Sequence, residues 1–290
     1  MKPLTFVGLA LAVLGLPISA NAETITLAAA GGQPVLQYQA AANPFKPYVA
    51  QLYTPGGVAV LRDSPSDHLH HHALMFAVSV EGVSFWEERP ACGRQVPREF
   101  KQERDRLAQA LDWTTPEGKV VLREERTLKI HAEMARTVTL LTWRSRLQVP
   151  SDREEVVLTG SHYYGLGARF VTSMDQDGVF VNSAGAAGEV VRGTERLTNA
   201  AWCAYTAAVD GKPVTFALFD HPANLRHPSR MFTMTVKFAY LAATLNLWKE
   251  PYTLEAARPL DLRYGVALWD GKVEPAAITA LYLRWKKLAE

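Results

Sequence analysis

The chain has 290 residues, of which 48% are hydrophobic and 10% aromatic, enough to form the core of one large domain. Its formal net charge is +2, and basic residues are interspersed with acidic ones, as in Arg123-Glu124-Glu125-Arg126. Such a surface has no basic stripe that follows phosphates, so we expect no nucleic-acid partner. Two cysteines, Cys92 and Cys203, do not form a zinc motif, and they could equally pair or stay free.

The N-terminus is typical of a secretory signal. Lys2 supplies a positive charge, Leu4–Leu16 form a short apolar stretch, and Ala20-Asn21-Ala22 is a small-residue cleavage site. The apolar stretch is shorter than the roughly 20 residues that span a bilayer, and no later stretch is long and apolar enough. We therefore predict a signal peptide at residues 1–22, a single mature domain at 23–290, and a periplasmic or secreted location. An uncleaved anchor is the alternative.

Alternating or continuously apolar segments rich in Val, Leu, Thr and aromatic residues predict β-strands. Examples are Val120–Ile130, Arg136–Val149 and Val156–Phe170. The dipeptide Asp210-Gly211 separates two apolar runs and indicates a hairpin, because both turn positions need residues that tolerate positive φ. About fifteen such strands joined by short polar turns predict an all-β fold, a large antiparallel β-sandwich.

One helix is predicted at the C-terminal end, over Glu274–Leu288. Pro275 lies near its start and Lys286-Lys287 near its end, as the helix dipole favours. Helical spacing places four apolar residues on one face: Ile278, Leu281, Trp285 and Leu288. Residues Pro97–Ala110 are ambiguous, because their composition is locally helical although a strand would fit there.

The main candidate site is a histidine-rich segment. Four of the eight histidines lie within residues 68–72, close to Arg62 and to the carboxylates of Asp63 and Asp67. Adjacent imidazoles repel one another once protonated, so the cluster indicates stabilisation by a metal, a carboxylate or a catalytic role. A solvated loop, with histidines bonded to backbone carbonyls, is the alternative.

Alternation along an extended chain predicts how these side chains are divided. His68, His70 and His72 would face one side of a strand, and His71 the other, together with its neighbours of odd number. A His-x-His pair on a strand can present two nitrogens to one metal, and imidazole suits zinc, copper, iron or nickel. His68, His70 and His71 are therefore candidate ligands of a possible divalent metal. Acid–base chemistry at the same residues would require no cofactor.

A second polar cluster, Asp220–His227, directly follows the predicted strand Val214–Phe219. Its polar groups would emerge at a sheet end, where they could line a polyol or carboxylate pocket. The candidates are His221, Asn224, Arg226 and His227. A turn held by bonds from Asp and Asn side chains to the backbone is the alternative.

A third candidate is Ser161–Phe170, where His162 and Arg169 flank glycines that permit a close approach by a ligand or another strand. A bulge in a core strand would produce the same pattern. His131 stands alone and is predicted to be structural. Several aromatic residues near turns could stack sugars, although core packing is the alternative for each. They are Phe85-Trp86, Trp202, Trp248 and Trp269.

Several of these motifs, in order, resemble the PmoA-like family over roughly Asn43 to Gly271. The matching segments are Asp67–His71 with Phe76, Gly82–Trp86, Gly165–Phe170, Asp220–Pro228 and Leu262–Tyr264. Three positions differ from the family pattern: Leu69 replaces a proline, His72 an arginine and Ala73 a glycine. His68, His70 and His71 therefore match the family pattern, whereas His72 does not.

The resemblance implies two different functions. The family label, methane oxygenase-like, implies copper or iron oxygenase chemistry. Family members also resemble companions of carbohydrate-degradation systems, and the implied sandwich is similar to the galactose-mutarotase-like fold. A fold alone does not establish a site, so both implications are expectations.

Our leading hypothesis is a carbohydrate-active enzyme that works by acid–base chemistry. One of His68, His70 and His71 would be the general base or acid, oriented by Asp63 or Asp67. His221 or His227 would be the opposing acid, which requires the two clusters to share one cavity. Five residues would hold a small-molecule or oligosaccharide ligand: Arg62, His162, Arg169, Asn224 and Arg226. Ring opening, epimerisation, elimination and hydrolysis all stay open. The alternatives are a metal-dependent oxygenase or hydrolase and a non-catalytic sugar-binding module.

Overall fold

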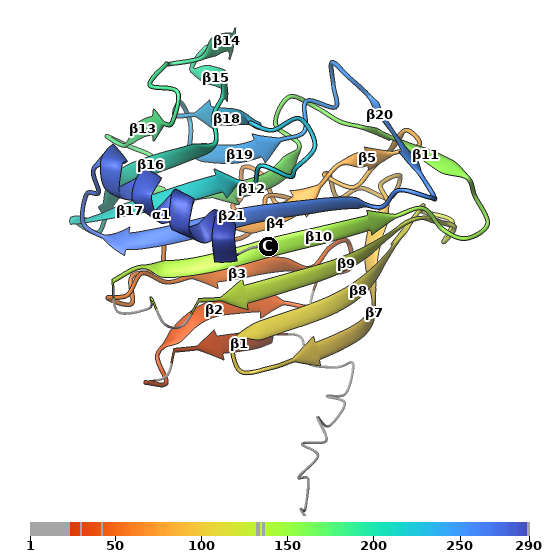
Figure 1. The fold of residues 1–290 in the computed structure, drawn as a ribbon, viewed down its shortest axis with the longest axis horizontal. Helices are drawn as coiled ribbons and strands as arrows, with labels where there is room; N and C mark the ends of the chain where they lie inside the picture. Colours follow the sequence, from red (N-terminus) through yellow and green to blue (C-terminus); the bar gives the residue numbers. More distant parts are fainter. Residues whose placement is uncertain (1–23, 30, 42, 132–133, 135–136, 289–290) are drawn as a thin grey trace, which may run out of the picture.

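The computed structural model describes residues 24–29, 31–41, 43–131, 134 and 137–288 (Figure 1). The expected signal peptide, residues 1–22, lies outside these residues and stays a prediction. The described chain forms three sheets whose strand pairs are antiparallel. The prediction of a large antiparallel sandwich with a short C-terminal helix is therefore confirmed.

The first layer is a nine-stranded sheet that mixes strands from the whole length of the chain. In spatial order it contains β1 (Thr24–Ala28), β2 (Pro34–Gln39), β3 (Tyr48–Leu52), β4 (Leu74–Ala77), β12 (Gly165–Arg169), β19 (Tyr240–Thr244), β18 (Arg230–Met234), β15 (Glu195–Asn199) and β14 (Glu189–Arg192).

The second layer is an eight-stranded sheet of longer strands. Its spatial order is β13 (Val179–Asn182), β16 (Trp202–Val209), β17 (Lys212–Asp220), β21 (Leu260–Asp270), β10 (Thr139–Gln148), β9 (Val120–Ile130), β8 (Arg106–Thr114) and β7 (Arg94–Gln102). In Figure 1 it lies in front of the nine-stranded sheet, with α1 (Pro275–Leu288) across its outer face.

A small third sheet and a short helical turn complete the fold. The sheet contains β20 (Tyr252–Glu255), β11 (Glu155–Thr159), β5 (Ser79–Val80) and β6 (Val83–Ser84). The helical turn is a 3₁₀ segment, η2 (Thr172–Met174). Within the residues that the structure describes, we find no helix with the length and apolar character needed to cross a bilayer.

The main core lies between the two large sheets. A continuous cluster of buried apolar side chains joins both layers. Some polar side chains inside it are paired, as where Tyr38 on β2 donates a 2.6 Å hydrogen bond to Gln109 on β8. Buried polar groups must find such partners because desolvation otherwise destabilises the fold. A second cluster seals α1 onto the outer face of the eight-stranded sheet through residues such as Phe219 and Trp285.

The sequence-based elements agree with the structure to different degrees. The Asp210-Gly211 hairpin is confirmed between β16 and β17, with φ of 48° and 80° at its two turn residues. The ambiguous segment Pro97–Ala110 is strand, shared by β7 and β8. The expected strand Val156–Phe170 is two strands in different sheets, β11 and β12. Cys92 and Cys203 are both buried free thiols.

Register in the nine-stranded sheet decides which side chains face outward. Tyr240 of β19 pairs with Arg169 of β12, and Phe76 of β4 pairs with Leu166 of β12. Residues 166 and 169 point to opposite faces, because strand side chains alternate. Phe76 contacts Trp113 of β8 at a ring separation of 6.1 Å. The side of the nine-stranded sheet that carries Phe76 and Leu166 therefore faces the interior of the sandwich. The face that carries Tyr240 and Arg169 is therefore turned away from the eight-stranded sheet.

Candidate functional site

The histidine-rich segment is a loop of tight turns between β3 and β4, and it is not an extended strand. The amide of His68 donates to the carbonyl of Pro65, and the amide of His71 donates to the carbonyl of His68, each at 2.9 Å. An isolated bridge between Asp63 and His72 closes the base of the loop. The predicted alternation is therefore wrong, because successive turns place His68 and His71 on the same side.

Three histidine rings of this loop meet. His68 stacks on His71 with a centroid separation of 4.6 Å and an interplanar angle of 27°. His70 contacts His71 at 4.7 Å and His68 at 5.8 Å. Phe238, which immediately precedes β19, packs against His68 at 5.0 Å and against His71 at 5.7 Å. The loop is thereby fixed to the outer face of the nine-stranded sheet.

These rings line a cavity of about 660 Å³, a volume within the usual range for small-molecule sites. Besides His68, His70 and His71, aromatic walls come from β18, β19 and the segment before β12, and charged groups come from loops. The other lining residues are Glu87, Arg89, Tyr163, Arg192, Gly193, Thr194, Glu195, Phe232, Met234, Val236, Lys237, Phe238 and Tyr240.

Asp67 orients His68. Its Oδ2 lies 2.9 Å from Nδ1 of the His68 ring. Arg169, which is buried, donates from Nη2 to the same oxygen at 3.2 Å, and its guanidinium lies 3.3 Å from the centroid of Phe238. Burial by itself would raise the pKa of Asp67, but the His68 hydrogen bond and the Arg169 charge outweigh it and hold the pKa at about 2. Asp67 is therefore ionised, and it accepts a hydrogen bond from the protonated Nδ1 of His68.

His71 forms the deepest part of the histidine wall and is only 7% exposed. Burial, followed by the nearby rings of His70 and His68, lowers the pKa of His71 to about 2. The imidazole is therefore neutral at physiological pH. Behind it, Tyr240 lies 5.5 Å away, and a Cβ placed on Gly167 would come within 2 Å of the Tyr240 hydroxyl (1.8 Å). Gly167 thus provides the space for the ring that supports His71.

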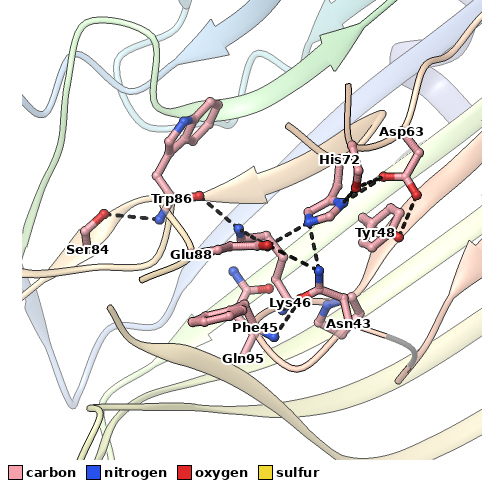
Figure 2. A network of polar contacts seen from close by, with 12 residues as sticks. Asn43, Phe45, Lys46, Tyr48, Asp63, His72, Ser84, Trp86, Glu88 and Gln95 are labelled. Atoms are coloured by element: carbon pink, nitrogen blue, oxygen red, sulfur yellow. Dashed lines mark hydrogen bonds and ion pairs between the residues drawn. The ribbon is translucent and has the colours of Figure 1, made fainter. Parts of the chain in front are cut away.

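His72 belongs to a different network, on the other side of the loop (Figure 2). Its Nδ1 lies 2.7 Å from Asp63 Oδ1 and its Nε2 lies 2.7 Å from Glu88 Oε1. Burial by itself would lower the pKa of His72, but the hydrogen bonds to the two carboxylates outweigh it, so the pKa is raised. The ring also stacks on Tyr48 at 4.2 Å, and Tyr48 donates a 2.8 Å hydrogen bond to Asp63.

Lys46 completes the charge balance of this network. It is 1% exposed, and its Nζ donates to Glu88 Oε1 at 2.8 Å and to the carbonyl of Trp86 at 2.9 Å. Burial lowers the pKa of Lys46, and the Glu88 carboxylate opposes that shift. Protonated Lys46 and His72 would balance the carboxylates of Asp63 and Glu88, so that no net charge is buried. The network links the loop after β6 to the base of the histidine loop. We interpret it as support for the cavity, and Asp63 as a partner of His72 that does not orient His68.

The second cluster lies away from the cavity. Asp220 is fully buried and accepts hydrogen bonds from His227 Nδ1 and from the Ser229 amide, each at 2.7 Å. The Asn224 side chain pairs with the backbone of Arg263 at 2.7 Å in both directions, and so continues the β17–β21 pairing beyond Asp220. Figure 1 shows β17 and α1 on the layer opposite the site.

Contacts of the cluster's other residues do not reach the cavity lining either. His221 Nε2 lies 3.3 Å from the carbonyl of Lys286 in α1, and Arg226 donates a 2.7 Å hydrogen bond to the carbonyl of Leu245. None of the described cavity-lining residues belongs to Asp220–His227. The expectation that the two clusters share one cavity is therefore corrected: this segment is a turn that closes one end of the sandwich.

The remaining candidates lie around the cavity. His162 contacts Tyr163 at 4.9 Å and lies 3.3 Å from Glu195, both of which line the cavity. Arg62 is 3.8 Å from Asp175 and supports the base of the loop, where its amide donates to the carbonyl of Arg169.

His131, predicted to be structural, lies between β9 and β10 and contacts the Thr142 hydroxyl at 2.8 Å.

The three cavity histidines pack against one another. His68 and His71 are stacked at 4.6 Å with an interplanar angle of 27°, whereas the ligands of one ion direct their nitrogens to a common position. Asp67 already occupies Nδ1 of His68. Throughout the described part of the chain we find no group of three or more His, Cys, Asp or Glu residues placed to hold a metal.

Sequence reasoning missed most of the cavity wall. Glu87, Arg89 and the pair Arg192 and Glu195 lie in ordinary polar segments, where nothing in the local pattern marks them. Phe238 and Tyr240 have the apolar spacing of any strand. The one local signal for the cavity wall was weak: Tyr163 directly follows His162, which was a candidate binding residue.

The fold and the site together define a β-sandwich protein with a histidine-lined cavity on the outer face of its larger sheet. A model described as a family of unknown function (DUF6807) matches residues 26–283, and the chain belongs to this family. A search of functionally curated proteins returns no match.

Solved structures with related chain traces have low sequence identity. GH36 alpha-galactosidase AgaA from Geobacillus stearothermophilus in complex with raffinose matches with a TM-score of 0.45 and 10% identity. The same enzyme with stachyose matches with a TM-score of 0.46 and 12% identity. Each match covers 86% of this chain and 41% of the galactosidase, so this chain spans about two fifths of that enzyme. HI1317 matches with a TM-score of 0.35 and 9% identity, over 84% of this chain and 99% of HI1317.

Proposed function

We propose that this protein is a carbohydrate-active enzyme in which the Asp67–His68 pair performs acid–base chemistry in the cavity. The observation that carries the proposal is the 2.9 Å contact between Asp67 Oδ2 and His68 Nδ1, together with the position of His68 in the cavity wall. A carboxylate that holds Nδ1–H leaves Nε2 as the lone pair that accepts a proton, which is the arrangement of a general base.

The charges around this pair keep it in that state. Arg169 holds Asp67 ionised, and the imidazolium that forms when His68 accepts a proton gains a carboxylate partner. The adjacent His71 ring is neutral, because burial lowers its pKa to about 2, and so it does not repel the new positive charge. Arg169 does not line the cavity and contacts it through Asp67 and Phe238, so it is a positioning residue.

The cavity wall supports a sugar as the ligand. The buried rings of Phe232, Phe238 and Tyr240 and the partly exposed ring of Tyr163 give the cavity apolar walls, while Glu87, Arg89, Arg192, Glu195 and Lys237 provide hydrogen-bonding groups. Aromatic walls beside polar groups suit a ring whose two faces are apolar and whose edge carries hydroxyls. The rim carboxylates are ion-paired, Glu87 to Arg89 at 3.0 Å and Glu195 to Arg192 at 2.6 Å.

The test is the variant His68→Gln beside the matched control His227→Gln. Both histidines bond an aspartate through Nδ1, but only His68 lines the cavity. The parent protein is first screened for turnover of neutral and acidic mono- and oligosaccharides and of their keto derivatives. Loss of a positioned general base is expected to lower kcat/KM by about a hundredfold or more in His68→Gln, with the control near the parent.

Three outcomes would overturn the proposal. Equal turnover by His68→Gln and the parent would show that His68 is not the general base. Binding of saccharides without turnover by the parent would indicate the non-catalytic binding module. The absence of both binding and turnover would end the assignment to carbohydrates.

We also propose export of the protein and keep the PmoA-like resemblance as a hypothesis about ancestry. Lys2, the apolar stretch Leu4–Leu16 and the small residues at 20–22 support a cleaved leader. Expression of the full chain with N-terminal sequencing of the product tests this. A mature N-terminus near residue 23 is expected, and an intact Met1 in the exported fraction would contradict cleavage.

A further inference from the structure

Trp248 is a large aromatic side chain left at the surface beside the cavity. It follows β19 in the segment 246–250, and the residue is 42% exposed. The other exposed large hydrophobic residues in the described chain are aliphatic. Single exposed apolar side chains are common on protein surfaces, so what distinguishes Trp248 is its position next to the cavity wall.

Aromatic contacts connect Trp248 to the cavity wall through one residue, His162. The ring of His162 meets Trp248 edge-on at 6.1 Å and an angle of 73°. On its other side His162 contacts Phe232 at 5.4 Å and Tyr163 at 4.9 Å, and both of these line the cavity. Only one imidazole therefore separates the exposed indole from the wall of the site.

Polar groups surround the exposed indole as they surround the cavity rim. The ammonium of Lys249 lies 4.9 Å from the Trp248 ring centroid and 3.6 Å from Glu189. Glu250 is 3.4 Å from Arg226, a residue of the Asp220–His227 segment. Glu250 and Glu189 are more than half exposed, so their carboxylates can accept hydrogen bonds from a ligand.

We propose that Trp248 is a second stacking platform, on which a distal ring of an oligosaccharide lies while a proximal ring occupies the cavity beside His68. This inference rests on the proposed function and names its substrate class: saccharides long enough to cross His162, and not monosaccharides alone. It also assigns a role to two candidates outside the cavity lining, because His162 would lie beneath the ligand and Arg226 beside it.

The experiment measures affinity as a function of chain length. Isothermal titration of the full-length protein uses ladders of one to six residues from β-1,4-glucan, β-1,4-mannan, β-1,4-xylan and α-1,4-galacturonan. In the series that binds, affinity should rise at the length that reaches Trp248. In Trp248→Ala the Kd of the hexasaccharide should increase about tenfold, as expected for one lost stacking contact, while that of the monosaccharide should change less than about twofold.

Two further variants make the result specific. Trp248→Phe keeps a ring and should recover most of the affinity for the hexasaccharide. Leu283→Ala removes another exposed apolar side chain, 48% exposed on α1 on the opposite layer, and should bind the whole ladder as the parent does.

The outcomes separate this inference from the proposed function. Two results would show that Trp248 does not stack a distal sugar ring: a hexasaccharide that binds no more tightly than the monosaccharide, or an unchanged hexasaccharide Kd in Trp248→Ala. Neither result would affect the proposal that His68 performs acid–base chemistry. If no member of the four ladders binds or turns over, the carbohydrate assignment and the platform fall together.

Discussion

His71 and His72 are adjacent in the chain, but their rings lie in separate electrostatic environments. His71 lines the cavity and stacks on His68 at 4.6 Å, whereas His72 lies between the carboxylates of Asp63 and Glu88 at 2.7 Å from each. The pKa of His71 is lowered and that of His72 is raised. A single peptide bond thus separates a neutral imidazole that faces the site from one that is held between two carboxylates.

Replacing His72 should destabilise the fold. His72→Gln removes the cation beside Asp63, whose side chain is 33% exposed, whereas Glu88 keeps Lys46 at 2.8 Å, so the variant should lose about 1–3 kcal/mol of stability. Because the folded-state pKa of His72 is raised, its contribution is complete below the unfolded-state value of 6.5 and is lost as the pH rises through the folded-state value. Urea denaturation at pH 6 and pH 9 should show a larger deficit at pH 6. A deficit that does not depend on pH would contradict the charged state of His72.

His71 should make the protein sensitive to acid. Its pKa falls from 6.5 to about 2 on folding, so below pH 6.5 the unfolded chain binds a proton that the folded chain does not. The folded state then loses about 1.4 kcal/mol per pH unit from this group. His71→Gln removes that slope, and its stability relative to the parent should improve by about 2 kcal/mol between pH 7 and pH 5. Parallel stability curves for the two proteins would refute the assignment.

Gly167→Ala should disturb the cavity through Tyr240. The added Cβ would lie 2.7 Å from Cζ of Tyr240 and closer still to its hydroxyl, so the ring that supports His71 must move. Overpacking of this kind costs about 1–3 kcal/mol. Gly31→Ala is the control, because a Cβ there meets nothing within 4 Å. Thermal unfolding of both variants tests this, and equal melting temperatures would indicate that Tyr240 relaxes freely.

Arg169→Met should change the pH dependence of turnover. Without the guanidinium the pKa of Asp67, held at about 2 in the parent, should rise, and protonated Asp67 no longer orients His68. The acid limb of kcat/KM should therefore move to higher pH. Arg62→Gln is the control, since Arg62 is 3.8 Å from Asp175 and does not contact Asp67 in the described interactions. An unshifted profile in an Arg169→Met protein that remains folded would remove Arg169 as a positioning residue.

Metal analysis tests the oxygenase or hydrolase hypothesis. Because the rings of His68 and His71 stack and the described residues contain no group of three metal ligands, we expect dialysis against a chelator to leave turnover unchanged. The measurement is elemental analysis of the purified protein before and after reconstitution with copper, iron and zinc. Near-stoichiometric metal that disappears in His70→Ala would show that the loop rearranges around an ion, and would favour the metal-dependent alternative.

Much of the secondary structure was accessible from the sequence, because alternation and turn chemistry are local. The strand Val120–Ile130 matches β9 at both ends, and the helix Glu274–Leu288 matches α1 to within one residue. The break between β11 and β12 was missed, since the aromatic pair Tyr163-Tyr164 has the composition of a strand although Gly160 and Ser161 precede it. Composition alone does not show that a chain leaves one sheet and enters another.

The sequence by itself determined the strands, the hairpin at Asp210-Gly211 and the presence of a histidine cluster beside carboxylates, because these depend on neighbours within a few residues. Only the tertiary structure decided that Asp67 orients His68 while Asp63 binds His72, since turns set the direction of each ring. It also brought Arg169, Phe232, Phe238 and Tyr240 to the same place and kept Asp220–His227 away. The physical reason is sheet register: pairing between distant strands fixes which face each side chain occupies.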